Sequence, residues 1–146
     1  TCMPTEPDLE STTPAMKARL EHVAFWVRDL EGMSAFYARH FGAVVGPRYE
    51  NPAHGFASRF LGFGGGARVE LMTTTTLDPV THAPGAQRMG LTHVALAVGS
   101  EAVVDRLTDA LRSEGLPVLD APRRTGDGYY ESVVLDPEGN RVEITV

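Results

Sequence analysis

Two segments of this chain occur twice in nearly the same form. Residues 20–24 (LEHVA) return as residues 91–95 (LTHVA), and residues 66–71 (GARVEL) return as residues 139–144 (GNRVEI). A repeat of this kind predicts two copies of one structural unit, because each copy has apolar and turn residues at matching places. We therefore expect two tandem modules within the 146 residues of the chain.

Each copy opens with a histidine and closes with a glutamate. His22 and Glu70 are 48 positions apart, and His93 and Glu143 are 50 positions apart. A single histidine on an apolar strand is usually a packing or surface residue. Two histidines at duplicated places, each followed by a glutamate at a similar interval, are hard to explain by core packing alone. These four side chains are therefore candidate metal ligands.

The same order of elements is predicted in both copies. Residues 20–27 and 91–98 are apolar and rich in β-forming residues, so each is predicted to be a strand, and a helix follows each strand. The helix caps expected from residue type are Asp29 and Gly42 in the first copy and Ser100 and Gly115 in the second. Three short strands close each copy, at residues 43–49, 56–63 and 68–73 and at residues 118–121, 129–135 and 141–145. The predicted fold class is α+β, with two tandem βαβββ modules.

Domain boundaries follow from these elements. Residues 1–17 contain prolines among polar residues without apolar periodicity, and we predict that they form an N-terminal arm. The folded domain is expected at residues 18–146. Within it we place module one at 18–76, a linker at 77–89 and module two at 90–146.

Composition argues against several classes of function. The formal net charge is −6 and basic residues do not cluster beyond Arg123-Arg124, so no nucleic-acid partner is expected. No apolar stretch approaches the roughly 20 residues of a membrane-spanning helix, and no basic and apolar leader opens the sequence, so we predict no membrane partner and a cytoplasmic location. The single cysteine, Cys2, lies in the arm, so chemistry in the folded part must use histidines, carboxylates or hydroxyls.

The placement of the four candidate ligands resembles the vicinal oxygen chelate superfamily, which includes glyoxalase I, methylmalonyl-CoA epimerase, extradiol dioxygenases and bleomycin-resistance proteins. In that superfamily a ligand lies on the first and the last strand of each module, and residues 136–140 (DPEGN) match its closing hairpin. The resemblance covers residues 18–146. It implies that the modules form a cup around one divalent metal per site, held by His22, Glu70, His93 and Glu143. A full set of two histidines and two glutamates is most similar to glyoxalase I.

This ligand set also predicts a type of chemistry. Two imidazoles and two carboxylates suit Ni, Zn, Co, Mn or Fe, with positions left for substrate oxygens. Such a centre polarises a carbonyl and stabilises the enediolate that forms when the neighbouring carbon loses its proton. The resemblance to glyoxalase I assigns the proton-accepting role to Glu143, with Glu70 as the mirror-image alternative. We therefore predict a metal-dependent lyase or isomerase that acts on a small carbonyl compound.

Alternative functions remain open at this point. Glyoxalase I enzymes commonly hold glutathione with an arginine and an asparagine, and this chain has Trp26 and Thr74 at those places, so glutathione is not assumed. A methylmalonyl-CoA epimerase-like isomerase is the nearest alternative, although epimerases often have glutamine where this chain has Glu70. A bleomycin-resistance-type binding protein is the non-catalytic alternative, but it needs no metal ligands. Ring-cleaving oxygenase activity is disfavoured by the additional anionic ligand. Family members are commonly dimers, and we expect a homodimer.

The remaining aromatic and charged residues are expected to have structural or surface roles. Trp26, Phe56 and Phe60 are predicted to be packing residues. His40, His54 and His82 are predicted to be surface residues without a role in the site, and His54, in a polar loop between strands, is the first candidate for an exception. Tyr129 and Tyr130 are adjacent on one predicted strand, so only one of them can face the cup. For Arg123 and Arg124, exposed solubilising charges are favoured over a clamp for a substrate carboxylate or phosphate.

Overall fold

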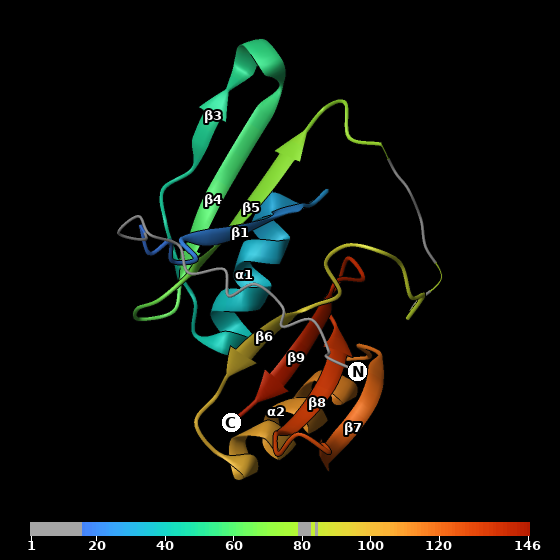
Figure 1. Cartoon of the computed structure of the whole chain (residues 1–146). Helices are drawn as coiled ribbons and strands as arrows, with labels where there is room; N and C mark the ends of the chain where they lie inside the picture. The colour runs from blue at the N-terminus through green and yellow to red at the C-terminus, as the bar shows by residue number, and fades with distance from the viewer. Residues whose placement is uncertain (1–15, 79–82, 84) are drawn as a thin grey trace, which may run out of the picture.

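The computed structural model describes residues 16–78, 83 and 85–146. The predicted arm therefore lies almost wholly outside the described residues, as do residues 79–82 and 84 of the predicted linker. Two modules follow one another along the chain, and each consists of one helix packed on one face of a sheet (Figure 1). This arrangement confirms the predicted α+β fold with two βαβββ-like modules. No helix in the described part of the chain is long and apolar enough to span a membrane.

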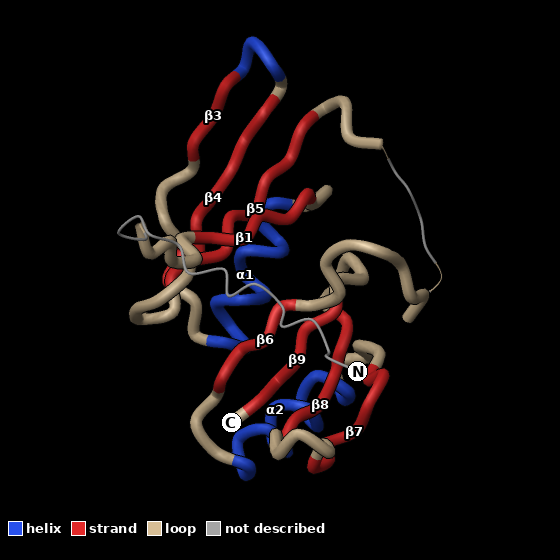
Figure 2. Tube along the Cα trace, in the orientation of Figure 1, coloured by secondary structure: helices blue, strands red, loops and turns tan. Residues whose placement is uncertain are grey.

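The helices and strands follow the predicted order (Figure 2). Module one contains β1 (His22–Trp26), α1 (Leu30–Phe41), β2 (Val44–Val45), β3 (Tyr49–Asn51), a 3-10 turn (Pro52–His54), β4 (Phe56–Gly62) and β5 (Arg68–Thr74). Module two contains β6 (Val94–Ala97), α2 (Glu101–Ser113), β7 (Val118–Arg124), β8 (Tyr130–Leu135) and β9 (Arg141–Thr145). The strand orders are β1-β5-β4-β2, with β3 also paired to β4, and β6-β9-β8-β7.

Three of the four predicted helix caps lie where residue types placed them, whereas α2 ends with Glu114 as its C-cap and Gly115 follows it. The Asp29 side chain accepts a hydrogen bond from the Gly32 N–H, and the Ser100 hydroxyl accepts one from the Val103 N–H. Gly42 ends α1 with a φ of 68°, in the left-handed region that glycine adopts without strain. These local signals fix where each helix begins and where the first one ends.

Several predicted strands have different bounds in the structure. The single strand expected at residues 43–49 is divided into β2 and β3, because Pro47 between them has no N–H for a sheet hydrogen bond. In the second module, β7 continues to Arg124, beyond the predicted end at residue 121, and its pairing with β8 shifts register twice. The first strands are shorter than predicted: β1 covers His22–Trp26 within residues 20–27, and β6 covers Val94–Ala97 within residues 91–98, so His93 lies just before its strand.

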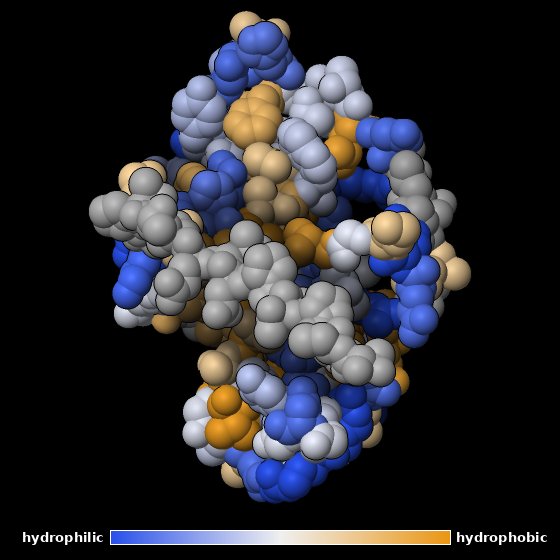
Figure 3. Space-filling model, in the orientation of Figure 1, coloured by the Kyte–Doolittle hydropathy of each residue, from blue (hydrophilic) through white to orange (hydrophobic). Residues whose placement is uncertain are grey.

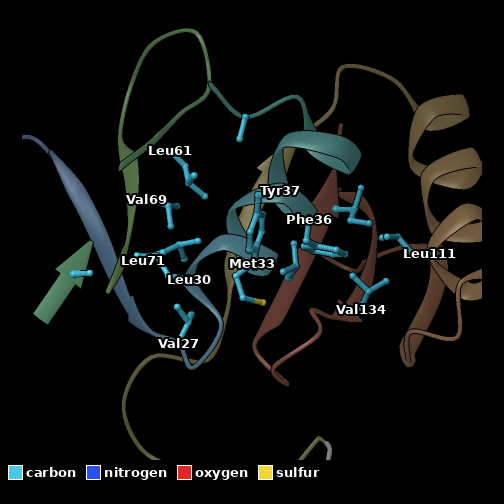
Figure 4. Packing of buried hydrophobic residues seen from close by; sticks show 14 of the residues in the cluster. Val27, Leu30, Met33, Phe36, Tyr37, Leu61, Val69, Leu71, Leu111 and Val134 are labelled. Atoms are coloured by element: carbon cyan, nitrogen blue, oxygen red, sulfur yellow. The ribbon is translucent and has the colours of Figure 1, made fainter. Parts of the chain in front are cut away.

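Strand pairing fixes the face of the sheet on which the candidate ligands lie. In module one, β1 and β5 are parallel and Ala24 is paired with Glu70, which places the His22, Ala24 and Glu70 side chains on one face. The same pairing joins Ala95 to Glu143 in module two. We call these two surfaces the first-module and the second-module site face. The opposite face of each sheet packs against its helix, as the buried cluster in Figure 4 shows.

Polar contacts of α1 connect the two modules. The Tyr37 hydroxyl donates a 2.7 Å hydrogen bond to the buried Asp136 carboxylate. Burial raises the pKa of Asp136 above its ordinary value, although the hydrogen bonds from Tyr37 and Asn140 oppose this shift. The Glu114 carboxylate accepts from Arg39 and pairs with His40. His40 was predicted to be a surface residue, and this was wrong, since its side chain is 8% exposed and lies against Phe36.

The turn between β1 and α1 forms a second connection. The Glu138 carboxylate, in the closing hairpin of module two, accepts hydrogen bonds of 2.7 and 2.9 Å from the backbone N–H groups of Arg28 and Asp29. These N–H groups lie just before the helix, where a carboxylate is favoured by the helix dipole. The DPEGN hairpin therefore holds the modules in a fixed relation.

Candidate metal centre

The first ligand pair lies on adjacent parallel strands. His22 on β1 and Glu70 on β5 lie with Nε2 and Oε1 3.8 Å apart, and their side chains are 40% and 16% exposed. The edge of the His22 ring meets the Phe60 ring, with the centroids 5.3 Å apart. An imidazole and a carboxylate thus point to the same accessible point on the first-module site face.

The His22 ring is oriented by its own sequence neighbour. Nδ1 of His22 contacts the Glu21 carboxylate, which also binds Arg68. The hydrogen bonds from His22 and Arg68 lower the pKa of Glu21. A carboxylate at Nδ1 favours a proton on that nitrogen and leaves the lone pair on Nε2, the atom nearer Glu70. Glu21 therefore holds the His22 ring in the orientation and tautomer that a metal-binding histidine needs.

The second ligand pair has the same arrangement on β9 and just before β6. His93 Nε2 lies 3.1 Å from Oε2 of Glu143, and the side chains are 38% and 17% exposed. Thr92 occupies the position that Glu21 occupies in module one. The two pairs are therefore alike in their ligands but differ in the groups around them.

Sequence reasoning missed a third carboxylate beside the second pair. Glu131 on β8 faces the same side as Val133, the residue paired with Glu143, and it is only 7% exposed. A hydrogen bond with the Glu143 carboxyl group, together with burial, raises the pKa of Glu131 to about 7. None of the described residues pairs with the buried Oε2 atom of Glu131. The signal that could have identified Glu131 is its place on the predicted strand, two residues before Val133 and on the same face. The repeat did not indicate it, because the matching residue of module one is Ser58.

This buried carboxyl group predicts a pH-dependent stability of the metal-free protein. The ordinary pKa of Glu131 is 4.5 and its folded value is about 7. The folded state therefore retains a proton that the unfolded chain loses, and this contribution is full below pH 4.5 and is lost as the pH rises through 7. We expect Glu131→Gln to gain stability over the original protein across this interval, because a glutamine side chain does not ionise.

Urea unfolding in the presence of a chelator, at about pH 4.5 and about pH 8, measures this difference. Glu50→Gln is a matched control, because Glu50 is an exposed glutamate on β3 whose side chain pairs only with Arg48 among the described residues. An identical effect of Glu131→Gln at both pH values would contradict the prediction.

The two ligand pairs do not form one group within the chain. In the part of the chain that the structure describes, no three histidine, cysteine, aspartate or glutamate side chains are placed to hold a metal ion. The chemistry of each pair nevertheless fits half of a divalent-metal site, since one imidazole nitrogen and one carboxylate oxygen face the same side. An open cleft of about 990 Å³ borders both Ala24 and Trp26 of β1 and His93 of the second module.

Three aromatic residues predicted to be packing residues lie on the first-module site face. Trp26 is 51% exposed and its ring meets that of Phe56, while Phe60 lies against His22. In Figure 3, orange and tan atoms form a column over the upper module, where β4 and β5 lie in Figure 1. The prediction was wrong for Trp26, because α1 covers the other face of this sheet and leaves the Trp26 side chain exposed. Phe56 and Phe60 are partly buried and pack against neighbouring rings.

The remaining candidates do not join either ligand pair. Tyr129 and Tyr130 face opposite sides, as predicted: Tyr129 is exposed, and the Tyr130 hydroxyl donates a bond to Asp105 on α2. Arg124 pairs with Glu101, and Arg123 donates to the backbone oxygen of Glu131. His54 ends the exposed 3-10 turn of module one, and His82 lies outside the described residues.

Comparison with known protein families identifies the fold. The Glyoxalase/Bleomycin resistance protein/Dioxygenase superfamily matches residues 19–144. The chain belongs to this superfamily. The match includes both ligand pairs and the closing hairpin, so the duplicated frame is the duplicated module of the glyoxalase superfamily.

Several relatives carry glyoxalase names. A putative lactoylglutathione lyase from Brassica oleracea var. gemmifera is 28% identical over 133 residues, which are 88% of this chain and 44% of that protein. Glyoxalase I from Zea mays has a TM-score of 0.69 at 25% identity, over 87% of this chain and 44% of the maize chain. Leishmania major glyoxalase I shares the fold, with a TM-score of 0.69 at 23% identity over 88% and 86% of the two chains. The chain thus spans less than half the length of its Brassica relative.

Proposed function

We propose that this glyoxalase-superfamily protein is a divalent-metal-dependent lyase or isomerase that acts on a small carbonyl compound through an enediolate. The observation that carries the proposal is the duplicated pair: His22 with Glu70 and His93 with Glu143 occupy the same register positions of two superfamily modules. The similarity to a putative lactoylglutathione lyase supports the glyoxalase I-like version. The identity of the metal, among Ni, Zn, Co, Mn and Fe, and the cytoplasmic location stay predictions.

We also propose a homodimer in which each complete site takes one ligand pair from each chain. Each pair supplies two donors, and both histidines are more than a third exposed in the single chain. β1 and β6 are the outer strands of their sheets and have one free edge each within the described sheets. A second copy can bring its second-module site face to the first-module site face, which would combine His22 and Glu70 with the partner's His93 and the partner's Glu143.

Within this site the residues have separate tasks. The metal, when bound by the four ligands, would polarise the substrate carbonyl and acidify the adjacent C–H group. Glu143 is the proposed base, since a carboxylate near that carbon can accept its proton. Glu131 supports this assignment, because it places a second carboxyl group beside Glu143, whereas the matching position next to Glu70 is Ser58. His22 is held by Glu21 for ligation.

The alternatives differ in substrate and in need for a metal. A methylmalonyl-CoA epimerase-like isomerase would use the same carboxylates on an acyl-CoA. A bleomycin-resistance-type binding protein would hold an aromatic drug without a metal. The two complete ligand pairs favour catalysis over sequestration.

Solvent deuterium exchange at the substrate carbon tests the proposal. Metal-loaded protein is incubated in D₂O with the hemithioacetal of methylglyoxal and glutathione, with methylmalonyl-CoA, or with free α-hydroxy ketones, and exchange is followed by NMR. We expect metal-dependent exchange with at least one of these compounds, and the compound that exchanges identifies the carrier. Absence of exchange from all three, together with tight metal-independent binding of an aromatic drug, would replace the proposal by the sequestering function.

A further inference from the structure

Aromatic side chains extend the first-module site face beyond its ligand pair. Trp26 ends β1, Phe56 begins β4, and their rings meet edge to face with centroids 6.2 Å apart. Tyr49 of β3 meets the other side of Phe56 with centroids 6.1 Å apart. Trp26 and Tyr49 are 51% and 58% exposed. We name Trp26, Tyr49 and Phe56 the aromatic shelf.

A continuous strip of sheet joins the metal ligands to the aromatic shelf. His22, Ala24 and Trp26 alternate along β1 on one face, and all three are exposed. Ala24 has only a methyl group, so the space above it is open, and it borders the cleft between the modules. His22 and Trp26 are four positions apart on the strand, a distance of roughly 13 Å. This length holds one or two flat rings attached to a metal-chelating head.

The side chains next to Phe56 on the site face are uncharged, whereas the cleft that Trp26 lines also contains Arg28 and Glu138. Asn51 and Thr74 lie on the same face, because they are the residues next to Phe56 in the register of β3, β4 and β5. Glu50, between Tyr49 and Asn51, points to the other face and pairs with Arg48. A charged substrate group at the shelf would lose water without gaining an ionic partner from these residues. An uncharged group is therefore favoured.

The second-module site face has smaller side chains at two of the corresponding positions. Ala97 matches Trp26 on the first strand and Val133 matches Phe60, whereas Tyr129 matches Phe56. The second-module site face is therefore less crowded at its first strand, which leaves room for a flat group between the two faces of the proposed dimer.

We propose that the aromatic shelf holds a flat, uncharged aryl group of the substrate, so that the substrate class is an aryl-substituted compound with vicinal oxygens. An aryl α-hydroxy ketone or an aryl dicarbonyl derivative has this chemistry. The inference deepens the proposed function and rests on it, because the oxygens of the same molecule must reach the metal ligands. Trp26, Tyr49 and Phe56 are then specificity-determining residues, since edge-to-face contacts favour an aromatic ring over an aliphatic ring of similar size.

Hydroxamates test this inference, because they share one chelating head and differ only in the attached group. Zn²⁺-loaded protein is titrated by calorimetry with acetohydroxamate, cyclohexanecarbohydroxamate, benzohydroxamate and 2-naphthohydroxamate. If only the buried apolar area mattered, the cyclohexyl compound would bind at least as tightly as the phenyl compound. Contacts with the aromatic shelf should reverse that order of affinity. We expect affinity to rise from methyl through cyclohexyl and phenyl to naphthyl, with phenyl about 10-fold above methyl. Trp26 is the single tryptophan of the chain, so its fluorescence should change with the two aryl compounds.

Matched variants locate the contact. Phe56→Leu retains an apolar side chain but removes the flat ring, so we expect it to lose the preference for phenyl over cyclohexyl while keeping its affinity for acetohydroxamate. Tyr129→Leu makes a corresponding change at the matching position of the second module and should keep the preference. An equal loss in both variants would contradict the assignment to the aromatic shelf.

The outcomes separate this inference from the proposed function. Equal binding of cyclohexyl and phenyl compounds by Zn²⁺-loaded protein would overturn the aryl preference and leave metal chelation intact. Failure of all four hydroxamates to bind the Zn²⁺-loaded protein would overturn chelation at this site, and the inference with it. Aryl binding that persists unchanged after metal removal would also overturn it, because the chelating head would then have no part in recognition.

Discussion

Two variants that bind no metal separately should bind it together. In the mixed dimer, one chain carries His22→Ala and Glu70→Ala and the other carries His93→Ala and Glu143→Ala. We expect this dimer to hold about one divalent ion, against about two in the original dimer. In such a dimer one site loses all four ligands, whereas the other combines the intact pair of each chain. The physical basis is that, among the described residues of one chain, no three candidate ligands are placed to hold a single ion.

The measurement is elemental analysis of co-expressed chains that carry different affinity tags, so that only the mixed dimer is purified. Each variant expressed alone is the control, and both should bind no metal ion at this site. If each site were built within a single chain, the mixed dimer would also be empty, because every chain would lack one pair. An empty mixed dimer, or an original protein that is a monomer at micromolar concentration, would contradict the shared site.

The modular fold could be predicted from the sequence because its signals are local and occur twice. Asp29 and Ser100 are capping residues followed by apolar helical stripes, and both cap the helices as expected. The apolar pattern of residues 43–49 did not reveal that this strand is divided in two. The division is explained by Pro47, which has no N–H for a sheet hydrogen bond. The matching registers of Glu70 and Glu143 follow from the repeated strand sequences around them, since the two copies differ by only two residues between histidine and glutamate.

The environment of each ligand could not be predicted in the same way. The face of β1 on which Trp26 lies is the exposed one because α1 packs against the other side, and this depends on tertiary contacts. Glu131 becomes unusual only when β8 and β9 are paired, since its carboxyl group then lies beside that of Glu143. The relation between the two ligand pairs depends on how modules and chains assemble. The sequence repeat therefore predicts which residues are candidate metal ligands, whereas tertiary packing determines which side chains surround them.

The two candidate bases should respond differently to the same small change. Glu143→Gln keeps an oxygen that can coordinate a metal, but an amide cannot accept a proton near neutral pH. We expect the metal-dependent deuterium exchange of the best substrate to fall about 10² to 10⁴-fold, the usual contribution of a general base. Glu70 has no counterpart of Glu131, because Ser58 occupies the matching position. Glu70→Gln should therefore weaken metal binding, but its loss of exchange should be much smaller than that of Glu143→Gln once the site is saturated with metal.

Exchange rates of both variants are compared at equal metal occupancy, which elemental analysis verifies on the same samples. This comparison separates loss of the base from loss of the ligand, because a pure ligand effect disappears when the site is filled. Calorimetry with benzohydroxamate provides a second control, since Glu143→Gln should still bind a chelating compound that donates no carbon-bound proton. A Glu70→Gln variant that loses exchange while Glu143→Gln keeps it would transfer the role of base to the first module. Equal losses in both variants at full occupancy would contradict a single base and indicate that each carboxylate moves a proton.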